Sequence, residues 1–144
     1  MSVVDQVRTK VQRILTDNFG KVEIDRDNDF VARKDSAVTF IRVREGFGDD
    51  GTIIDVKCPL LMEVPLTKEL FQWVATEGQM YKLGGVWVNP DDNGKTGWVY
   101  FKYAIIGEDL DESELMTAVG VVLVTSDQLD NELQEKFGGE LFGE

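Results

Sequence analysis

The fold of this chain follows from one alternating stretch, Thr52-Ile53-Ile54-Asp55-Val56-Lys57-Cys58. Three alternate side chains in it, Ile54, Val56 and Cys58, are apolar. Such a period of two predicts a β-strand with one buried face. We expect this apolar set to face helices and the other set, Ile53, Asp55 and Lys57, to face away from them. Pro59 is expected to close the strand.

Further strands are predicted on both sides of this stretch. Alternating or β-branched runs predict strands at 22–24, 30–32, 37–45, 85–89 and 96–105. Turn residues are expected to join them at 25–29, 35–36, 46–51 and 90–95.

Three helices are predicted from apolar residues at helical spacing. The capping residues Ser2, Thr67 and Asp111 open them, and glycines close them at Gly20, Gly78 and Gly138. The predicted class is α+β, an antiparallel sheet of about five strands with three helices in the order α-β-β-β-α-β-β-α. Residues 1–139 are expected to form a single domain, followed by a short, frayed acidic tail at 140–144.

The composition limits the possible binding partners of the chain and its cellular location. The chain has 144 residues, 15 Lys and Arg against 27 Asp and Glu, and a formal net charge of −12. That charge repels nucleic acid and anionic membranes, so we expect neither as a partner. A single cysteine and the lack of a secretory signal favour a reducing, cytoplasmic location.

The sequence contains no complete motif for catalysis, cofactor binding or metal binding. Histidine is absent, which removes the commonest general base and zinc ligand. The G-x-G-x-x-G spelling at 46–51 precedes a strand rather than a helix, and the triplet Asp25, Asp27 and Asp29 lacks the later ligands of a calcium loop. Cys58 is predicted to be a buried core thiol. We therefore expect no enzyme activity, no cofactor and no metal.

The outward set of side chains is unusual for a strongly acidic chain, because it combines aromatic rings with cations. We name it the outer aromatic–cation face: Phe40, Arg42, Arg44, Lys57, Trp87, Trp98, Tyr100 and Lys102. The same alternation places Val38 and Asp55 on it. Cross-strand pairing that only stabilises the sheet is one interpretation. The other is a surface for an acidic or amphipathic partner segment, or for a second copy of the chain.

The last helix allows two interpretations as well. Around Val119, Val122 and Leu123 it is apolar on almost every side, so every side should be buried. Either a deep groove in the core covers it, or a partner or homodimer mate does.

Four runs resemble the YbjN-like proteins, relatives of type III secretion chaperones: Ala37-Val38-Thr39-Phe40-Ile41-Arg42-Val43, Val56-Lys57-Cys58-Pro59-Leu60-Leu61, Gly84-Gly85-Val86-Trp87-Val88 and Lys136-Phe137-Gly138-Gly139. The resemblance spans about residues 3 to 139. It implies a sheet of about five strands flanked by three helices, and a non-enzymatic, chaperone-like role in binding peptides. Dimers are common in that family.

We therefore expect a peptide- or protein-binding module. Two alternatives stay open: a structural or regulatory subunit with one fixed partner, and an enzyme that uses only carboxylates and a metal.

Overall fold

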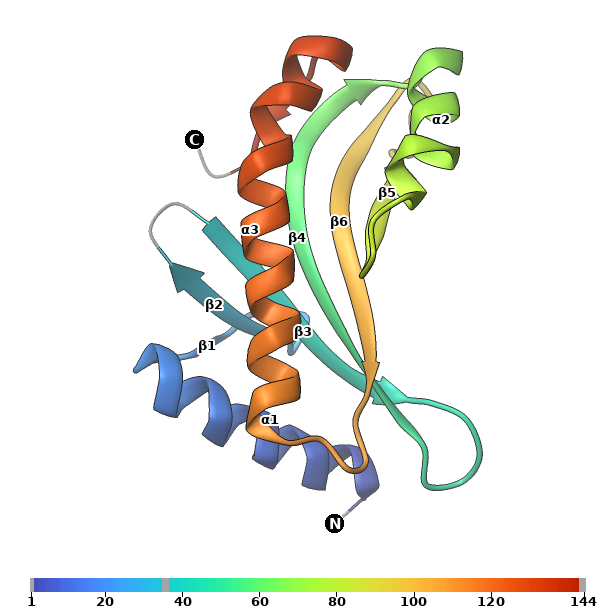
Figure 1. Cartoon of the computed structure of the whole chain (residues 1–144). Helices are drawn as coiled ribbons and strands as arrows, with labels where there is room; N and C mark the ends of the chain where they lie inside the picture. Colours follow the sequence, from blue (N-terminus) through green and yellow to red (C-terminus); the bar gives the residue numbers. More distant parts are fainter. Residues whose placement is uncertain (1, 35–36, 143–144) are drawn as a thin grey trace.

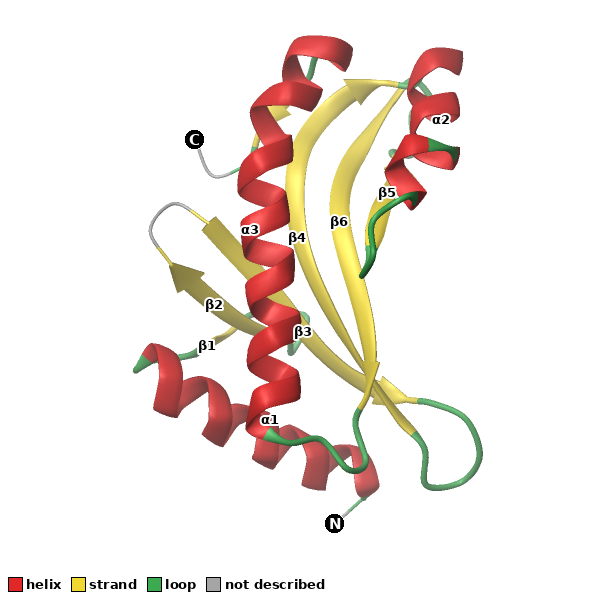
Figure 2. Cartoon of the chain, in the orientation of Figure 1, coloured by secondary structure: helices red, strands yellow, loops and turns green. Residues whose placement is uncertain are grey.

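One antiparallel sheet with helices on a single face makes up the chain (Figures 1 and 2). The computed structural model describes residues 2–34 and 37–142, so the turn predicted at 35–36 lies outside the described residues. The helices are α1 (Val3–Phe19), α2 (Lys68–Ala75), the short 3-10 helix η1 (Glu77–Gln79) and α3 (Glu112–Phe137). The strands are β1 (Glu23–Ile24), β2 (Phe30–Lys34), β3 (Ala37–Glu45), β4 (Thr52–Pro65), β5 (Gly85–Pro90), β6 (Thr96–Ile106) and β7 (Glu140–Leu141).

The predicted α+β class and the three α-helices are confirmed. The sheet has seven strands: the strand predicted at 22–24 forms the short β1, and only β7 was not predicted. Its order is β1-β2-β3-β4-β6-β5, and β7 pairs with β4. Figure 1 shows α3 lying lengthwise over β4. α1 lies across the beginning of α3, and α2 lies near the end of β4.

The helices begin where their capping residues predict. Ser2 Oγ accepts from the backbone N–H of Asp5, and Thr67 Oγ1 from that of Leu70, each at 3.1 Å. At the start of α3 the Asp111 carboxylate accepts from the backbone N–H of Glu114 at 2.7 Å. Each cap satisfies a backbone donor that would otherwise lack a partner in the first turn.

Strand β4 is longer than the sequence predicts, because Pro59 does not close it. The strand continues to Pro65 and pairs with β6 from Ile53 to Pro65, with irregularities in between. Register shifts follow Pro59 and Leu61, and Glu63 has a φ of 53°. Proline is tolerated in a strand at such irregularities, which also bend it. Pro59 therefore marks a bend in β4 rather than its end.

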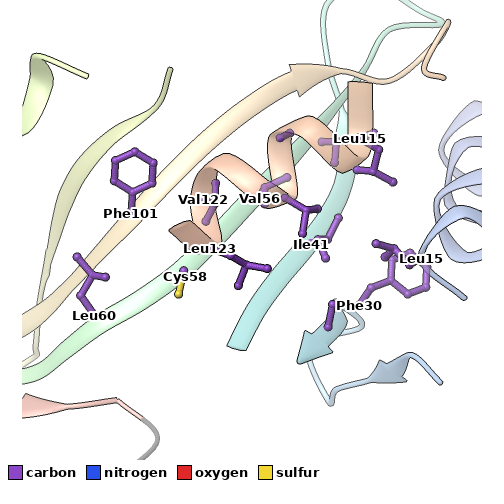
Figure 3. Close-up of a cluster of buried hydrophobic side chains, with 14 of the residues drawn as sticks. Leu15, Phe30, Ile41, Val56, Cys58, Leu60, Phe101, Leu115, Val122 and Leu123 are labelled. Atoms are coloured by element: carbon purple, nitrogen blue, oxygen red, sulfur yellow. The ribbon is translucent and has the colours of Figure 1, made fainter. Parts of the chain in front are cut away.

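The inner face of the sheet carries the core (Figure 3). The inward assignments are confirmed: these side chains are buried at Thr39, Ile41, Val43, Ile54, Val56, Cys58, Val86, Val99 and Phe101. Val88 and Tyr103 are partly buried against the same core. Val38, which the alternation predicts on the outward side of β3, is buried. It lines a small cavity together with Pro59 and Phe142.

The apolar centre of α3 is covered by the chain itself. Val119 and Val122 are fully buried, and Leu123 is 9% exposed. The groove in the core is therefore the correct interpretation, and the assignment of these three residues to a dimer surface is corrected. Val124, one residue further on, is 60% exposed.

The end of the chain also differs from the expected frayed tail at 140–144. Glu140 and Leu141 form β7 in register with Met62 and Leu61 of β4, and Phe142 N–H donates to the Leu60 carbonyl at 3.2 Å. Residues 143–144 lie outside the described residues.

Two valines of α3 test this burial. Val122→Ala should lower the free energy of unfolding by about 2 kcal/mol, because it leaves a cavity under the helix. Val124→Ala makes the same chemical change on the exposed side, and the helix propensity gained is equal in both. Urea unfolding of the two variants should show a loss for Val122→Ala only. Equal effects would contradict the placement of α3.

Glu108 joins the segment between β6 and α3 to the start of β4 through hydrogen bonds. Its carboxylate accepts hydrogen bonds from the backbone N–H of Thr52 and, at 2.8 Å, from the Thr52 hydroxyl. The backbone bond is the main cause that lowers the pKa of Glu108. A carboxylate whose pKa is lowered on folding stabilises the fold above its unfolded pKa, and that contribution is lost as the pH falls through the folded value.

Glu108→Gln should therefore flatten the acid side of the stability profile. Between about pH 5 and pH 3 the wild type should lose more stability than the variant, because only the wild type has this carboxylate to protonate. Thermal unfolding across that range measures the slope. Asp109→Asn removes the same charge at the exposed neighbour and should follow the wild-type slope; matching slopes for all three proteins would refute the role of Glu108.

Candidate functional site

The register of the sheet brings the predicted outer residues together. Phe40 of β3 lies opposite Lys57 of β4, and Lys57 lies opposite Lys102 of β6. Tyr100 of β6 lies between Pro59 of β4 and Trp87 of β5. Side chains at such positions on one face are within contact distance of each other. All eight residues of the outer aromatic–cation face therefore lie on the side of the sheet opposite the core.

A hollow of about 250 Å³ opens in the middle of this face. We name it the aromatic hollow. It is lined by Phe40, Lys57, Pro59, Trp98, Tyr100 and Phe142, and by a group of polar and charged residues that we call its rim: Asp25, Asp27, Asp29, Arg42 and Asn89. The aromatic walls are partly exposed, so a solvent-facing apolar surface stands where a sheet with one covered face normally shows polar side chains.

Phe142 belongs to this hollow and was missed by sequence reasoning. Its ring centroid lies 6.1 Å from that of Phe40 and 5.7 Å from that of Trp98. Its only signal in the sequence is the alternation Glu140-Leu141-Phe142 after two glycines, which is too short to predict a strand.

The arginines of the face are held by carboxylates of the same chain. Arg42 binds Asp29 through two hydrogen bonds of 2.7 and 3.0 Å, and Arg44 binds Asp55 at 2.6 and 3.4 Å. These side-chain hydrogen bonds are the main cause that raises the pKa of each arginine. Asp29 is buried and fixes Arg42 against the rim of the aromatic hollow.

The lysines lie over aromatic rings. Lys57 Nζ is 5.2 Å from the centroid of the Tyr100 ring, and Lys102 Nζ is 4.9 Å from that of Trp87. Lys102 is also 3.6 Å from the Asp55 carboxylate. Burial raises the pKa of the Tyr100 hydroxyl, which therefore stays protonated near neutral pH. Both lysines thus contribute to cation–π contacts within the face.

The number of cations on and beside the face equals the number of carboxylates there. Arg42, Arg44, Lys57 and Lys102 stand against Asp25, Asp27, Asp29 and Asp55. The sequence predicts cations interleaved with aromatic rings on this face, and the acidic turn at 25–29 adds carboxylates beside them. An acidic partner segment finds no surplus of positive charge here.

The motifs rejected at the sequence level have structural roles. Asp25 accepts from the backbone N–H groups of Asp27 and Asp29 at 3.0 and 2.9 Å, which closes the acidic turn. The loop at 46–51 closes through a bond from Gly46 N–H to the Gly51 carbonyl. Within residues 2–34 and 37–142, no three His, Cys, Asp or Glu side chains are grouped so as to hold a metal ion. Burial is the main cause that raises the pKa of the Cys58 thiol, which disfavours a nucleophilic thiolate.

A second hollow, of about 360 Å³, lies between α3 and the region of α2 and η1, and sequence reasoning did not find it. We name it the helix hollow. It is lined by Trp73, Glu77, Met80, Tyr81, Leu129, Glu132 and Lys136. Met80 is 81% exposed beside it.

Removal of the Asp29 carboxylate charge tests whether the rim is built around it. Asp29→Asn should lower the free energy of unfolding by about 1–2 kcal/mol, because charge-assisted hydrogen bonds to Arg42 are weakened while the half-exposed guanidinium can regain water. Asp27→Asn, an exposed neighbour in the same turn, should change it by less than about 0.5 kcal/mol. Urea unfolding measures both, and equal losses would contradict the assigned role.

Comparison with known proteins gives a consistent result. The sequence profile of the family "T3SS (YopN, CesT) and YbjN peptide-binding chaperone 1" (TY-Chap1) matches residues 5–144. The crystal structure of YbjN from E. coli, described provisionally as a transcription regulator, superposes with a TM-score of 0.59 at 9% sequence identity, covering 90% of this chain and 93% of that one. At that identity the superposition shows the fold alone. Among curated proteins, no sequence matches. None of the helices in the described part of the chain is long and apolar enough to span a membrane.

Proposed function

Because the chain belongs to the family of type III secretion and YbjN peptide-binding chaperones, we propose that it binds an extended peptide or unfolded protein segment in the aromatic hollow. The proteins of this family are chaperone-type binding modules. The single observation that carries the choice of site is the group of partly exposed rings, Phe40, Trp98 and Tyr100, on the sheet face opposite the core.

The chemistry of the hollow suits apolar anchors. Each apolar or aromatic side chain that a peptide buries there contributes on the order of 1.5–3 kcal/mol. After the entropic cost of association, a few such anchors give affinities of about micromolar strength. The rings of Trp98 and Tyr100 offer flat contact area to anchors of different shapes, as a binder of varied segments requires.

The electrostatics of the face favour apolar over acidic segments. Its four cations are balanced by four carboxylates, while the chain as a whole carries −12. The net charge keeps copies of the chain apart while an apolar surface stays exposed. The partner is therefore selected by its apolar side chains.

Binding to a membrane-supported array of 15-residue peptides of varied apolar and charge content tests the site. The double variant Trp87→Ala with Trp98→Ala should lose at least about tenfold in signal, because it removes two rings of the outer aromatic–cation face. Thermal unfolding should change little in comparison, since Trp87 is 47% exposed and Trp98 is partly exposed.

The matched control is Met80→Ser at the helix hollow, which should bind the array like the wild type. Loss of binding in Met80→Ser alone would move the site to the helix hollow. Binding by all three proteins to one sequence only, in a fixed stoichiometric complex, would instead indicate a subunit with a single partner.

Salt dependence separates apolar from ionic recognition. With the arginines already paired to Asp29 and Asp55, the affinity for a selected array peptide should change by less than about threefold between 50 and 500 mM NaCl. Fluorescence anisotropy of the labelled peptide measures this change. A drop of about tenfold or more would show that free cations recognise an acidic segment.

A further inference from the structure

Strand β7 occupies the one edge of β4 that β3 leaves open. The pairing of β3 with β4 ends at Lys57, and β6 lies along the opposite edge of β4. Beyond that point Leu61 and Met62 pair with β7, and the Leu60 carbonyl accepts from Phe142 N–H. Residues 140–142 are thus a short added strand beside the aromatic hollow.

The turn that returns the chain to this edge depends on two glycines. Gly138 and Gly139 have φ values of 81° and 86°, which L side chains rarely adopt. A Cβ atom at Gly139 would lie 2.7 Å from both the Met62 carbonyl oxygen and Val64 Cγ2. Gln134 Nε2 donates to the Gly139 carbonyl at 3.2 Å. The close approach of this turn to β4 therefore has no room for a side chain.

The added strand shows the features by which an extended peptide binds a sheet edge. Its backbone pairs with β4, Leu141 packs against the core, and the Phe142 ring enters the aromatic hollow beside Phe40 and Trp98. Backbone pairing supplies affinity in such binding, and pockets for alternate side chains supply selectivity. The segment thus has the same contacts that a bound partner peptide would make.

Two features favour the exchange of β7 at this edge and distinguish the edge from that of β5. β7 has two residues, so few contacts hold it, and elements with few contacts open at low free energy. At the β5 edge the Val86 carbonyl already accepts from Gln79 Nε2 at 2.8 Å, and η1 lies against this strand.

We propose that residues 140–142 are an internal ligand, and that a partner segment with an aromatic residue next to an aliphatic one replaces them on the edge of β4. The proposal rests on the proposed function and adds the mode of binding and the chemistry of the partner. A displaceable internal ligand lowers the apparent affinity for a partner by the fraction of molecules whose edge is open. It also covers the edge when no partner is bound, which limits pairing between copies of the chain.

The chain's own segment, supplied separately, is the probe. A fluorescein-labelled peptide of residues 137–144 is titrated against the full chain and against a chain that ends at Gly139. Fluorescence anisotropy should show binding to the shortened chain at least about tenfold tighter than to the full chain. The same peptide with Phe142→Ala should bind the shortened chain at least about tenfold more weakly, because the ring in the hollow is its anchor.

A second variant keeps the test decisive if the shortened chain is less stable. Phe142→Ala in the full chain keeps β7 but empties its place in the hollow, so array peptides should bind more tightly than to the wild type. Phe47→Ala, at an 86% exposed loop position, is the control and should leave the affinity unchanged.

Equal or weaker binding by the Phe142→Ala chain would overturn the proposal, because Phe142 would then be inert or part of the wall that holds the partner. Equal probe affinity for the full and the shortened chain would overturn it as well. If array peptides still depend on Trp98, the proposed function stands without the internal ligand. If none of the proteins binds the array, the proposed function itself fails.

Discussion

The packing of α3 across β4 is the interaction on which the rest of the structure depends. α3 buries Leu115, Val119 and Val122 on the inner face of the sheet, and β4 is the strand that β3, β6 and β7 all pair with. Because the helices contribute their apolar sides to one core, the other face of the sheet remains available. The outer face, where we propose that peptides bind, is therefore left uncovered by the one-sided packing of the helices (Figure 2).

The bend in β4 links this packing to the aromatic hollow. Irregular pairing of β4 with β6 begins at Pro59, and the pairing of β3 with β4 stops at Lys57. β7 fills the edge of β4 beyond that point. The acidic turn at 25–29 closes the hollow from another side, and Asp29 holds Arg42 at its rim. The aromatic hollow is therefore apolar in the middle and polar at its rim, an arrangement that is common in protein-binding surfaces.

Local sequence patterns predicted much of this arrangement. The capping residues of α1, α2 and α3, the period of α3 and the alternation of β4 each act over a few residues, so they were assigned correctly. What depends on contacts between distant segments was not. The bond between Arg42 and Asp29, the burial of Val38 and the pairing of β7 with β4 arise only once the chain has folded. Pro59 was misread because the rule that proline ends a strand does not hold at a register shift.

One measurement tests the central claim, that peptides bind the outer face of the sheet at the aromatic hollow. The two-dimensional ¹⁵N–¹H spectrum of the labelled chain is recorded while a peptide selected from the array is added. If this claim is right, the Trp98 indole N–H and backbone amides in β3, β4 and β6 around the aromatic hollow shift. Shifts confined to Trp73 and to residues of α2, η1 and α3 around the helix hollow would contradict it.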